Sequence, residues 1–218
     1  MTLALRHARV RYGPLEALHG VTLTAPAPGL TVLLGRNGSG RSTALRALAG
    51  TVRLAAGAVL WDGADVTRLP AYERARRGLC LVPERQAVFG SLTVRENLAL
   101  APGAHDAALT AYPQLEPLLA RRAGTLSGGE QRMLALARAL SVRARAVLVD
   151  EPTQGMAPDV AARTYEVLAS LDACVVLAEQ RLPPAPAVRR TVVVYELRRG
   201  SVVFAGEAAE LERRGSAR

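Results

Sequence analysis

Residues 35–42 of this chain of 218 residues have the sequence Gly-Arg-Asn-Gly-Ser-Gly-Arg-Ser. They follow the apolar run 30–34, which is typical of a buried strand, and they lead into residues 41–49, where the pattern predicts a helix ending at Gly50. Glycines in such a turn let successive backbone N–H groups converge on phosphate oxygens, and the dipole of the following helix favours bound anions. An ordinary glycine-rich turn is the alternative, but the flanking strand and helix favour a phosphate-binding loop.

Within this loop, Arg41 stands where a phosphate-binding loop normally has Lys. Arg keeps the charge and the N–H donors but is bulkier and forked, so the exchange is not conservative and nucleotide binding should survive it better than catalysis. Two interpretations stay open: Arg41 reflects drift under the codon bias and the function is retained, or Arg41 marks a slowed ATPase. We favour hydrolysis that is retained but slower. Ser42 can offer its hydroxyl to Mg²⁺. The candidate nucleotide-binding residues here are Gly35, Arg36, Asn37, Gly38, Ser39, Gly40, Arg41, Ser42 and Thr43.

A second informative segment is the apolar run 146–149, which predicts a buried strand and ends in two carboxylates, Asp150 and Glu151, followed by Pro152. Asp150 is a candidate to hold Mg²⁺ through water, and Glu151 to polarise an attacking water. In isolation, an ordinary strand ending in an acidic turn would explain the pattern equally well. The phosphate-binding loop upstream favours the catalytic interpretation.

The third segment, residues 126–131, has the sequence Leu-Ser-Gly-Gly-Glu-Gln. Ser127 is a good N-cap for a helix that begins at Gly128, and the two glycines let the backbone approach a ligand closely. A helix N-terminus with free N–H groups can bind phosphate. Capping explains Ser127 but not the whole hexapeptide, so its candidate nucleotide-binding residues are Ser127, Gly128, Gly129 and Glu130.

The composition is strongly basic, with 28 basic and 19 acidic residues and a formal net charge of +9. All the basic residues are Arg, and the chain has neither Lys nor Ile, which we interpret as a GC-rich coding bias. The arginines form no block, so a solvated basic face explains them, although nucleic acid or an anionic surface would also suit the charge. No apolar run approaches the ~20 residues that span a bilayer, and Arg6 comes too early for a signal peptide, so we expect a cytosolic chain.

Hydrophobic periodicity predicts an α/β fold. Strands are expected at residues 3–10, 21–24, 30–34, 57–61, 79–82, 146–149, 173–178, 191–196 and 202–205. Helices are expected at residues 41–49, 70–77, 93–100, 106–112, 115–122, 128–142 and 159–171. Residues 84–125 are helical with several breaks, which predicts a helical subdomain within a single domain of residues 1–218. Cys80 and Cys174 lie in apolar runs and are expected to be buried free thiols.

Taken in order, the three segments resemble the nucleotide-binding subunit of an ABC transporter, from about Leu3 to about Leu211. The resemblance implies a P-loop NTPase core with an N-terminal antiparallel β subdomain and a helical subdomain, and ATP and Mg²⁺ as ligands. It also implies a dimer, because in this family the segment at 126–131 contacts the γ-phosphate held by the other subunit. Tyr12 matches the aromatic residue that stacks on adenine in this family, although a strand-end Tyr is as often part of the core.

Two positions resemble one branch of this family, the ATPase subunits of branched-chain amino acid importers. Glu84 stands where most of the family has Gln, and Gln180 stands where it has a switch His. In this branch Glu and Gln are usual at these positions. The run Ser-Leu-Thr-Val-Arg-Glu-Asn-Leu from Ser91 and the segment 153–158 also resemble this branch. The resemblance thus implies catalytic roles for Glu84 and Gln180 beside Glu151.

We therefore expect an ATP-hydrolysing subunit that energises an ABC transporter of branched-chain or other amino acids at the cytoplasmic face of the membrane. The implied partners are transmembrane permease subunits and a second ABC ATPase, identical or related; no nucleic acid is expected. Prolines 183, 184 and 186 interrupt a segment that is helical in the family, which weakens the assignment of the solute. The alternatives are a non-transport ABC-type ATPase and a regulatory nucleotide-binding module with weak hydrolysis, the latter because of Arg41.

Overall fold

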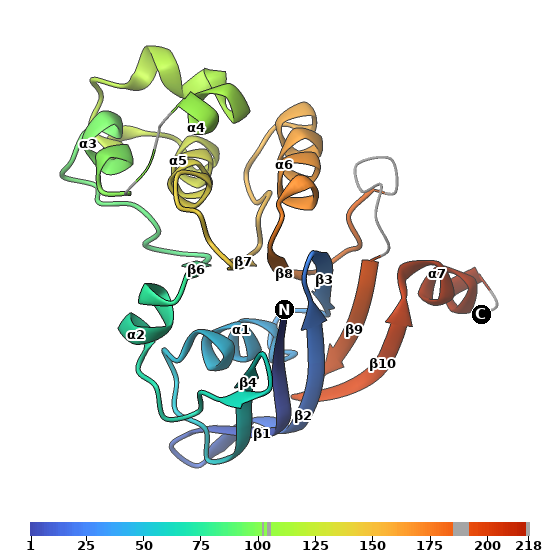
Figure 1. Ribbon diagram of the computed structural model, residues 1–218. Coiled ribbons are helices and arrows are strands. Elements are labelled where there is room, and N and C mark those ends of the chain that lie inside the picture. The colour runs from blue at the N-terminus through green and yellow to red at the C-terminus, as the bar shows by residue number, and fades with distance from the viewer. Residues whose placement is uncertain (102, 104–105, 185–191, 217–218) are drawn as a thin grey trace.

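The computed structural model describes residues 1–101, 103, 106–184 and 192–216, which form two sheets and their covering helices (Figure 1). The strands are β1 Thr2–Tyr12, β2 Leu15–Pro26, β3 Gly29–Leu34, β4 Ala56–Trp61, β5 Ala64–Asp65, β6 Leu79–Val82, β7 Ala146–Asp150, β8 Cys174–Glu179, β9 Val192–Arg198 and β10 Ser201–Glu207. The helices are α1 Arg41–Ala49, α2 Ala71–Arg76, α3 Val94–Ala99, α4 Asp106–Ala111, α5 Gly128–Leu140, α6 Pro158–Ser170 and α7 Ala208–Ser216, with 3-10 helices η1 Pro113–Leu118 and η2 Ala123–Thr125.

The central sheet has the strand order β10-β9-β3-β8-β7-β6, with every pair parallel except β10 with β9. Its inner strands are continuous apolar runs because both faces of the sheet are covered. In β7, Val147 and Val149 belong to one core cluster, whereas Ala146 and Leu148 belong to the cluster on the opposite face. The alternation packs one strand against two helical layers at once.

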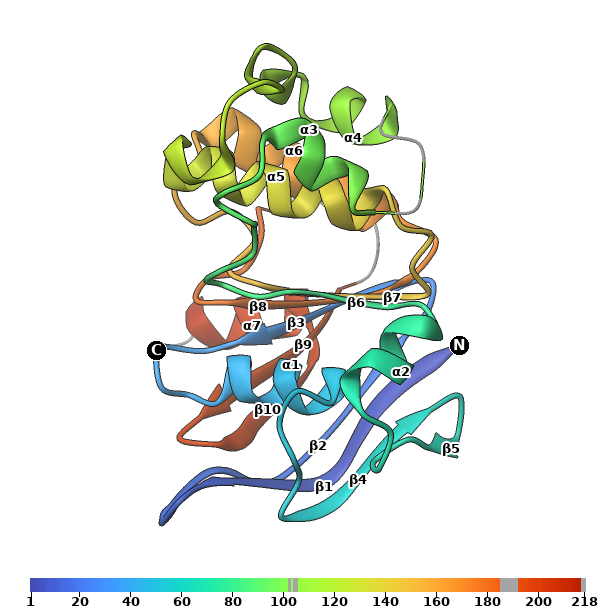
Figure 2. The same ribbon diagram turned by 90° about the vertical axis from the view of Figure 1, so that its left-hand side faces the viewer.

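The molecule is layered around this sheet (Figure 2). Helices α3, α4, α5 and α6 lie on one side, and α1, α2 and the antiparallel sheet β2-β1-β4-β5 lie on the other. Buried leucines bind each layer to the central sheet, for example Leu134 of α5 in one core and Leu48 of α1 in the other. No helix in the described part of the chain is long and apolar enough to cross a membrane.

Side chains satisfy exposed backbone groups at two helix ends near the core, the start of α5 and the end of α1. At the start of α5, the Ser127 hydroxyl accepts a hydrogen bond from the N–H of Glu130 at 3.3 Å, and the Glu130 carboxylate accepts one from the N–H of Ser127 at 2.7 Å. At the end of α1, the fully buried Arg74 donates to the carbonyls of Ala47 and Leu48 at 3.0 and 2.7 Å. Its positive charge there also complements the negative end of the helix dipole.

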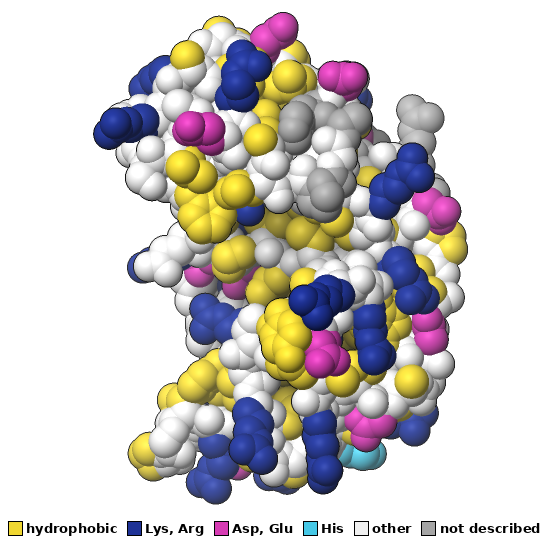
Figure 3. Space-filling model, turned by 60° about the vertical axis from the view of Figure 1, so that its left-hand side comes forward, with side chains coloured by type: hydrophobic (Ala, Val, Ile, Leu, Met, Phe, Trp, Pro, Cys, Tyr) yellow, Lys and Arg dark blue, Asp and Glu magenta, His cyan; other side chains and the backbone are white. Residues whose placement is uncertain are grey.

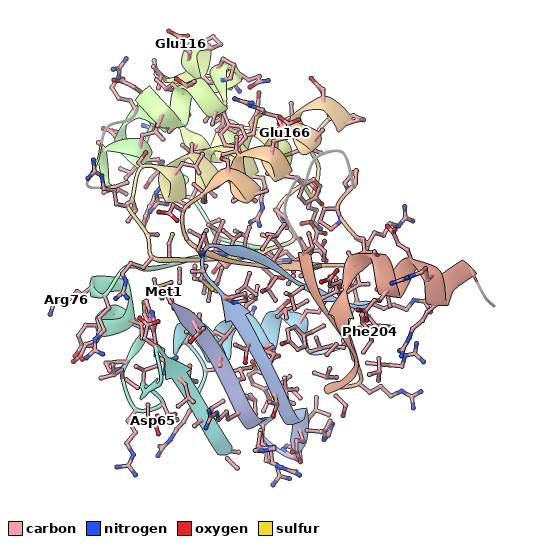
Figure 4. All side chains as sticks on the ribbon, turned by 45° about the vertical axis from the view of Figure 1, so that its right-hand side comes forward. Met1, Asp65, Arg76, Glu116, Glu166 and Phe204 are labelled. Carbon is pink, nitrogen blue, oxygen red and sulfur yellow. The ribbon has the colours of Figure 1, made fainter. Side chains whose placement is uncertain are left out.

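Most predicted elements are found within a few residues of their expected bounds, but the helix expected at 115–122 is wrong. The chain forms the shorter 3-10 helix η1 there, because Pro113 and Pro117 each remove a backbone N–H. Helix α7 and the short strand β5 were not expected. Phe204 of β10 lies against α7 (Figure 4), with the Arg214 guanidinium 4.9 Å from the centroid of its ring.

Two sequence predictions concern residues away from these elements. Both cysteines are free, as expected; Cys174 is buried, with its pKa raised to about 12 by desolvation, whereas Cys80 is only partly buried. Pro183 and Pro184 lie in an irregular segment after β8, and Pro186 lies outside the described residues. The first residue of the strand expected at 191–196 also lies outside them.

Candidate active site

Four loops that follow parallel strands meet at one edge of the central sheet. The phosphate-binding loop follows β3, Glu84 comes shortly after β6, Glu151 follows β7, and Gln180 follows β8. Ligands of open α/β sheets bind at the carboxyl ends of the strands, so this edge is the candidate site.

The loop between β3 and α1 has the backbone conformation that a phosphate cradle needs. Gly38 and Gly40 have φ angles of 76° and 105°, in the left-handed region that glycine adopts without steric cost. Helix α1 begins directly after Gly40 with no side-chain cap and no acidic residue in its first turn. Its first N–H groups are therefore available to an anion, and Ser42 and Thr43 lie partly exposed among them.

The turn between β9 and β10 supports this loop. The N–H of Gly200 donates to the Ser39 carbonyl at 2.9 Å, and the Gly200 carbonyl accepts from the N–H of His19 at 2.8 Å. Gly200 has a φ of 77°, and a Cβ there would lie 2.6 Å from the carbonyl oxygen of Ala17. Only glycine fits this junction of the loop, β2 and the hairpin.

A cavity of about 580 Å³ lies beside the phosphate-binding loop and the end of β9. Loop residues 34–39, Gln180 and residues 196–199 line it. Glu196 lies 3.4 Å from Arg198 and offsets part of the positive charge. The basic residues of the lining are Arg36, Arg198 and Arg199.

Arg41, Glu151 and Gln180 meet in one cluster. The buried Arg41 guanidinium lies 2.9 Å from Glu151 Oε1, as an ion pair without hydrogen-bond geometry, and it donates to Asn37 Oδ1 at 3.3 Å. Gln180 Nε2 donates to the same Glu151 oxygen at 3.2 Å. Glu151 has a φ of 51°, a conformation uncommon outside glycine and often found at functional sites. The structure therefore brings together three residues that the sequence separates.

Asp150 offers an oxygen that suits a metal ion. Burial raises the pKa of its carboxyl, and the hydrogen bond with Ser42 opposes that shift. Asp150 Oδ1 is buried and has no hydrogen-bond partner among the described residues. Nor do those residues contain a cluster of three or more His, Cys, Asp or Glu that could hold a metal without other ligands. One carboxylate beside a hydroxyl fits Mg²⁺, which binds proteins through few ligands and completes its shell with phosphate oxygens and water.

Sequence reasoning gave no role to Glu179, which is buried at the end of β8. Its Oε1 accepts a hydrogen bond from the Tyr165 hydroxyl at 2.6 Å, and Thr153 is 3.1 Å from that hydroxyl. Desolvation raises the pKa of Glu179 to about 7, the negative charge of Glu151 adds to the shift, and the Tyr165 bond opposes it. In the sequence, only its neighbour Gln180 pointed to a role for Glu179. The contact with Tyr165 of α6 cannot be inferred from the sequence of β8.

The remaining candidate residues lie apart from this cluster. Ser127 and Glu130 cap α5 in the helical layer, and a Cβ on Gly129 would lie 2.4 Å from the Gly155 carbonyl oxygen, so this segment contacts the loop after β7. A Cβ on Gly128 would meet nothing within 4 Å. Tyr12 ends β1 with 43% of its surface exposed.

A phosphate-binding loop and a carboxylate strand at the edge of such a sheet define a nucleotide-binding protein of the P-loop class. A sequence profile described as ABC transporter matches residues 18–154. The branched-chain amino acid transport ATP-binding protein BraG of Pseudomonas aeruginosa is 34% identical over 92% of this chain and 90% of its own length. The probable LivF of Archaeoglobus fulgidus is 36% identical over 92% and 89%. The chain belongs to the ABC transporter family.

Solved structures show the same fold. A nucleotide-free ATP-binding cassette from an ABC transporter superposes with a TM-score of 0.84 at 23% identity, covering 100% of this chain and 96% of the other. A bacterial cassette solved as a dimer gives a TM-score of 0.81 at 24% identity, with 94% and 98% covered. The two sheets and the helical layer thus form the ATP-binding cassette architecture that the sequence predicted.

The contact between the hairpin turn and the loop predicts the effect of Gly200→Ala. The new Cβ would collide with Ala17 and displace the turn from Ser39, so we expect ATP affinity to fall about tenfold, as misplacement of binding groups commonly does. Gly20→Ala is the matched control, because Gly20 has nearly the same φ, 78°, and open space around it. Calorimetric titration of both variants with ATP tests this, and equal affinities would contradict it.

The buried Glu179 predicts a pH dependence of stability. Its raised pKa means that the folded chain holds this proton more tightly than the unfolded chain. The stabilisation is present at low pH and is lost as pH rises to about 7 and above, by on the order of 3 kcal/mol. Glu179→Gln should remove this decline, so the variant gains stability relative to wild type as pH rises.

Urea unfolding at several values between about pH 5 and about pH 8 measures the effect. Glu166→Gln on α6 is the control, since that side chain is half exposed (Figure 4). Parallel pH profiles for wild type and Glu179→Gln would show that the Glu179 proton is not linked to folding.

Proposed function

We propose that this chain is the ATP-binding and hydrolysing subunit that energises an ABC membrane transporter. The observation that carries the proposal is the meeting of Arg41, Glu151 and Gln180 beside the phosphate-binding loop. These side chains come from three separate loops, and each matches a predicted role in phosphate binding or water activation. The family membership supports the same function.

The described residues account for binding of the nucleotide. N–H groups of the loop and of the first turn of α1, which has no side-chain cap, would bind the phosphates, and Arg41 would add a charged donor. Ser42 and Asp150 would hold Mg²⁺, which supplies charge neutralisation of the phosphate oxygens when bound. Tyr12 offers a half-exposed ring on which adenine can stack.

Hydrolysis requires a carboxylate that is free to act on water. Arg41 and Gln180 both contact Glu151 Oε1. A γ-phosphate competes with Glu151 for the Arg41 guanidinium, so binding of ATP draws Arg41 away and frees the carboxylate as a general base. Gln180 remains to orient Glu151. Glu84 takes part in catalysis from the loop after β6, and its charge contributes to the raised pKa of Asp150.

The finer assignment extends to partners and solute. The segment Ser127–Glu130 binds the phosphates held by a second ATPase chain, identical or related, because it forms the N-terminus of α5 and a Cβ on Gly128 would meet nothing within 4 Å. Permease subunits complete the transporter, and this chain lies on the cytoplasmic face of the membrane. The names of BraG and LivF support branched-chain or other amino acids as the solute.

A second candidate function is a regulatory nucleotide-binding module with weak hydrolysis. The buried Arg41 favours it, because a forked guanidinium already paired with Glu151 is harder to redirect than a lysine ammonium. Both candidates bind ATP, and only the rate of hydrolysis separates them.

Steady-state MgATP turnover of three proteins distinguishes these functions. We expect wild type to exceed Glu151→Gln by about 100-fold, since a positioned general base contributes on this scale. Arg41→Lys should raise kcat several-fold by releasing Glu151 more readily. A wild-type rate no higher than that of Glu151→Gln would overturn hydrolysis and support the regulatory module.

The helical segment 84–125 is our candidate for the permease contact. Phe89 and Leu100 are 53% and 50% exposed, unusually high for large apolar side chains. In Figure 3, hydrophobic side chains gather at the hollow where the helical layer meets the rest of the molecule. Phe89 is held in place by Arg138, whose guanidinium lies 5.1 Å from the ring centroid.

Purification of the tagged chain in mild detergent, followed by mass spectrometry, tests the partners. We expect a multi-span membrane protein to accompany wild type, and recovery to fall at least several-fold for Phe89→Ser. Leu15→Ser is the control, because Leu15 is 67% exposed but lies in β2 of the other layer. Recovery of ribosomal RNA or DNA, or of no partner, would contradict the transporter assignment.

A further inference from the structure

Arg132 is a buried cation on α5 that reaches the ends of two strands of the central sheet. It is 5% exposed, and its Nη1 donates to the Pro83 carbonyl at 2.6 Å. Its Nη2 donates to the Asp150 carbonyl, and its Nε to the Pro152 carbonyl at 3.4 Å. One guanidinium therefore ties together α5, the end of β6 and the end of β7.

The same guanidinium faces the acidic groups of the site. The charges of Asp150, Glu179, Glu151 and Glu84 all act on Arg132, opposing the effect of burial on its pKa. Its hydrogen bonds nevertheless go to backbone carbonyls on either side of the carboxylates. Arg132 therefore fixes the backbone beside Glu84, Asp150 and Glu151 through carbonyl oxygens rather than through the carboxylates.

We propose that Arg132 is a positioning residue for the reaction: it fixes the ends of β6 and β7 to helix α5 and thereby holds Glu84, Asp150 and Glu151 in place for Mg²⁺ and water. The proposal rests on the hydrolytic function proposed above. Because Ser127 begins the same helix, Arg132 also connects the segment 126–131 to the carboxylates of its own chain.

The position of Arg132 determines which step it affects. Its contacts go to residues beside the metal and water ligands, whereas the phosphate-binding loop is held by α1, β2 and the hairpin turn at Gly200. Loss of Arg132 should therefore disturb the Mg²⁺-dependent part of ATP binding and the chemical step. ATP binding without Mg²⁺ should be unaffected.

The test compares Arg132→Met, which keeps length and apolar volume, with Arg132→Lys, which keeps charge without the fork. Arg138→Met is the matched control: Arg138 also lies on α5 and donates to a loop carbonyl, that of Ala87 at 3.0 Å, but not at the site. For each folded variant, kcat, KM and the ATP affinity with and without Mg²⁺ are measured. Urea unfolding shows how much stability each change costs.

We expect Arg132→Met to lower kcat by about 10- to 100-fold and to reduce the Mg²⁺-dependent gain in ATP affinity about tenfold, on the scale of lost outer-shell partners at metal sites. Mg²⁺-free affinity should stay within about twofold, since its contacts are elsewhere. For Arg132→Lys, kcat and the Mg²⁺-dependent gain in affinity should lie between those of wild type and Arg132→Met. This variant decides the question if Arg132→Met does not fold. Arg138→Met should match wild type in these ATP measurements, because its contacts with Phe89 and Ala87 belong to the candidate permease surface and not to the carboxylate site.

The proposal would be overturned if the folded Arg132 variants had the same kcat and the same Mg²⁺ dependence of ATP affinity as Arg138→Met. If wild type hydrolyses no ATP, the proposed function fails, yet the Mg²⁺ dependence still decides the role of Arg132. An equal loss of affinity with and without Mg²⁺ would show a merely structural role and would also overturn it.

Discussion

The parallel pairing of β3, β8, β7 and β6 determines where every candidate group of the site lies. Leu34 pairs with Glu179, and Asp150 pairs with Ala178, so the loops after these strands leave the sheet at nearly the same level. Strand β8 lies between β3 and β7, which separates the phosphate-binding loop from Glu151 by roughly 10 Å at the usual strand spacing. A long side chain is needed to cross that distance, and Arg41 makes the contact from the start of α1.

Features set by local sequence were predictable. The apolar runs of β3, β6, β7 and β8 give the inner strands, because a strand buried on both faces has little room for polar residues. The glycines before α1 and the Ser127 cap of α5 are likewise local signals with a direct physical cause. The family resemblance named Glu151 and Gln180 as separate catalytic candidates, and the structure places Gln180 Nε2 3.2 Å from Glu151 Oε1.

Contacts between distant segments could not be predicted in this way. Arg132 meets Pro83 across 49 positions, and Gly200, near the end of the chain, meets Ser39, near its start, so no spacing rule connects either pair. Glu179 lies in an apolar strand whose pattern indicates burial but does not reveal the Tyr165 hydroxyl that donates a hydrogen bond to its carboxylate. The failed helix at 115–122 has a different cause, because apolar periodicity was given more weight than the prolines at its start.

The balance of charge at the site explains why these unpredicted residues matter. Two buried guanidiniums, those of Arg41 and Arg132, lie among four carboxyl groups: Asp150, Glu151, Glu179 and Glu84. If all four carboxyl groups were ionised, the site would carry an excess of negative charge. Desolvation by burial is the main cause of the raised pKa values of Asp150 and Glu179, and repulsion from the neighbouring carboxylate of Glu151 adds to both shifts. In the function proposed above, a divalent cation would relieve the excess, whereas the phosphates of ATP would add to it and compete for Arg41. The nucleotide and its metal ion would then be electrostatically interdependent: neither alone would balance the site, and both together would leave Glu151 free to act on water.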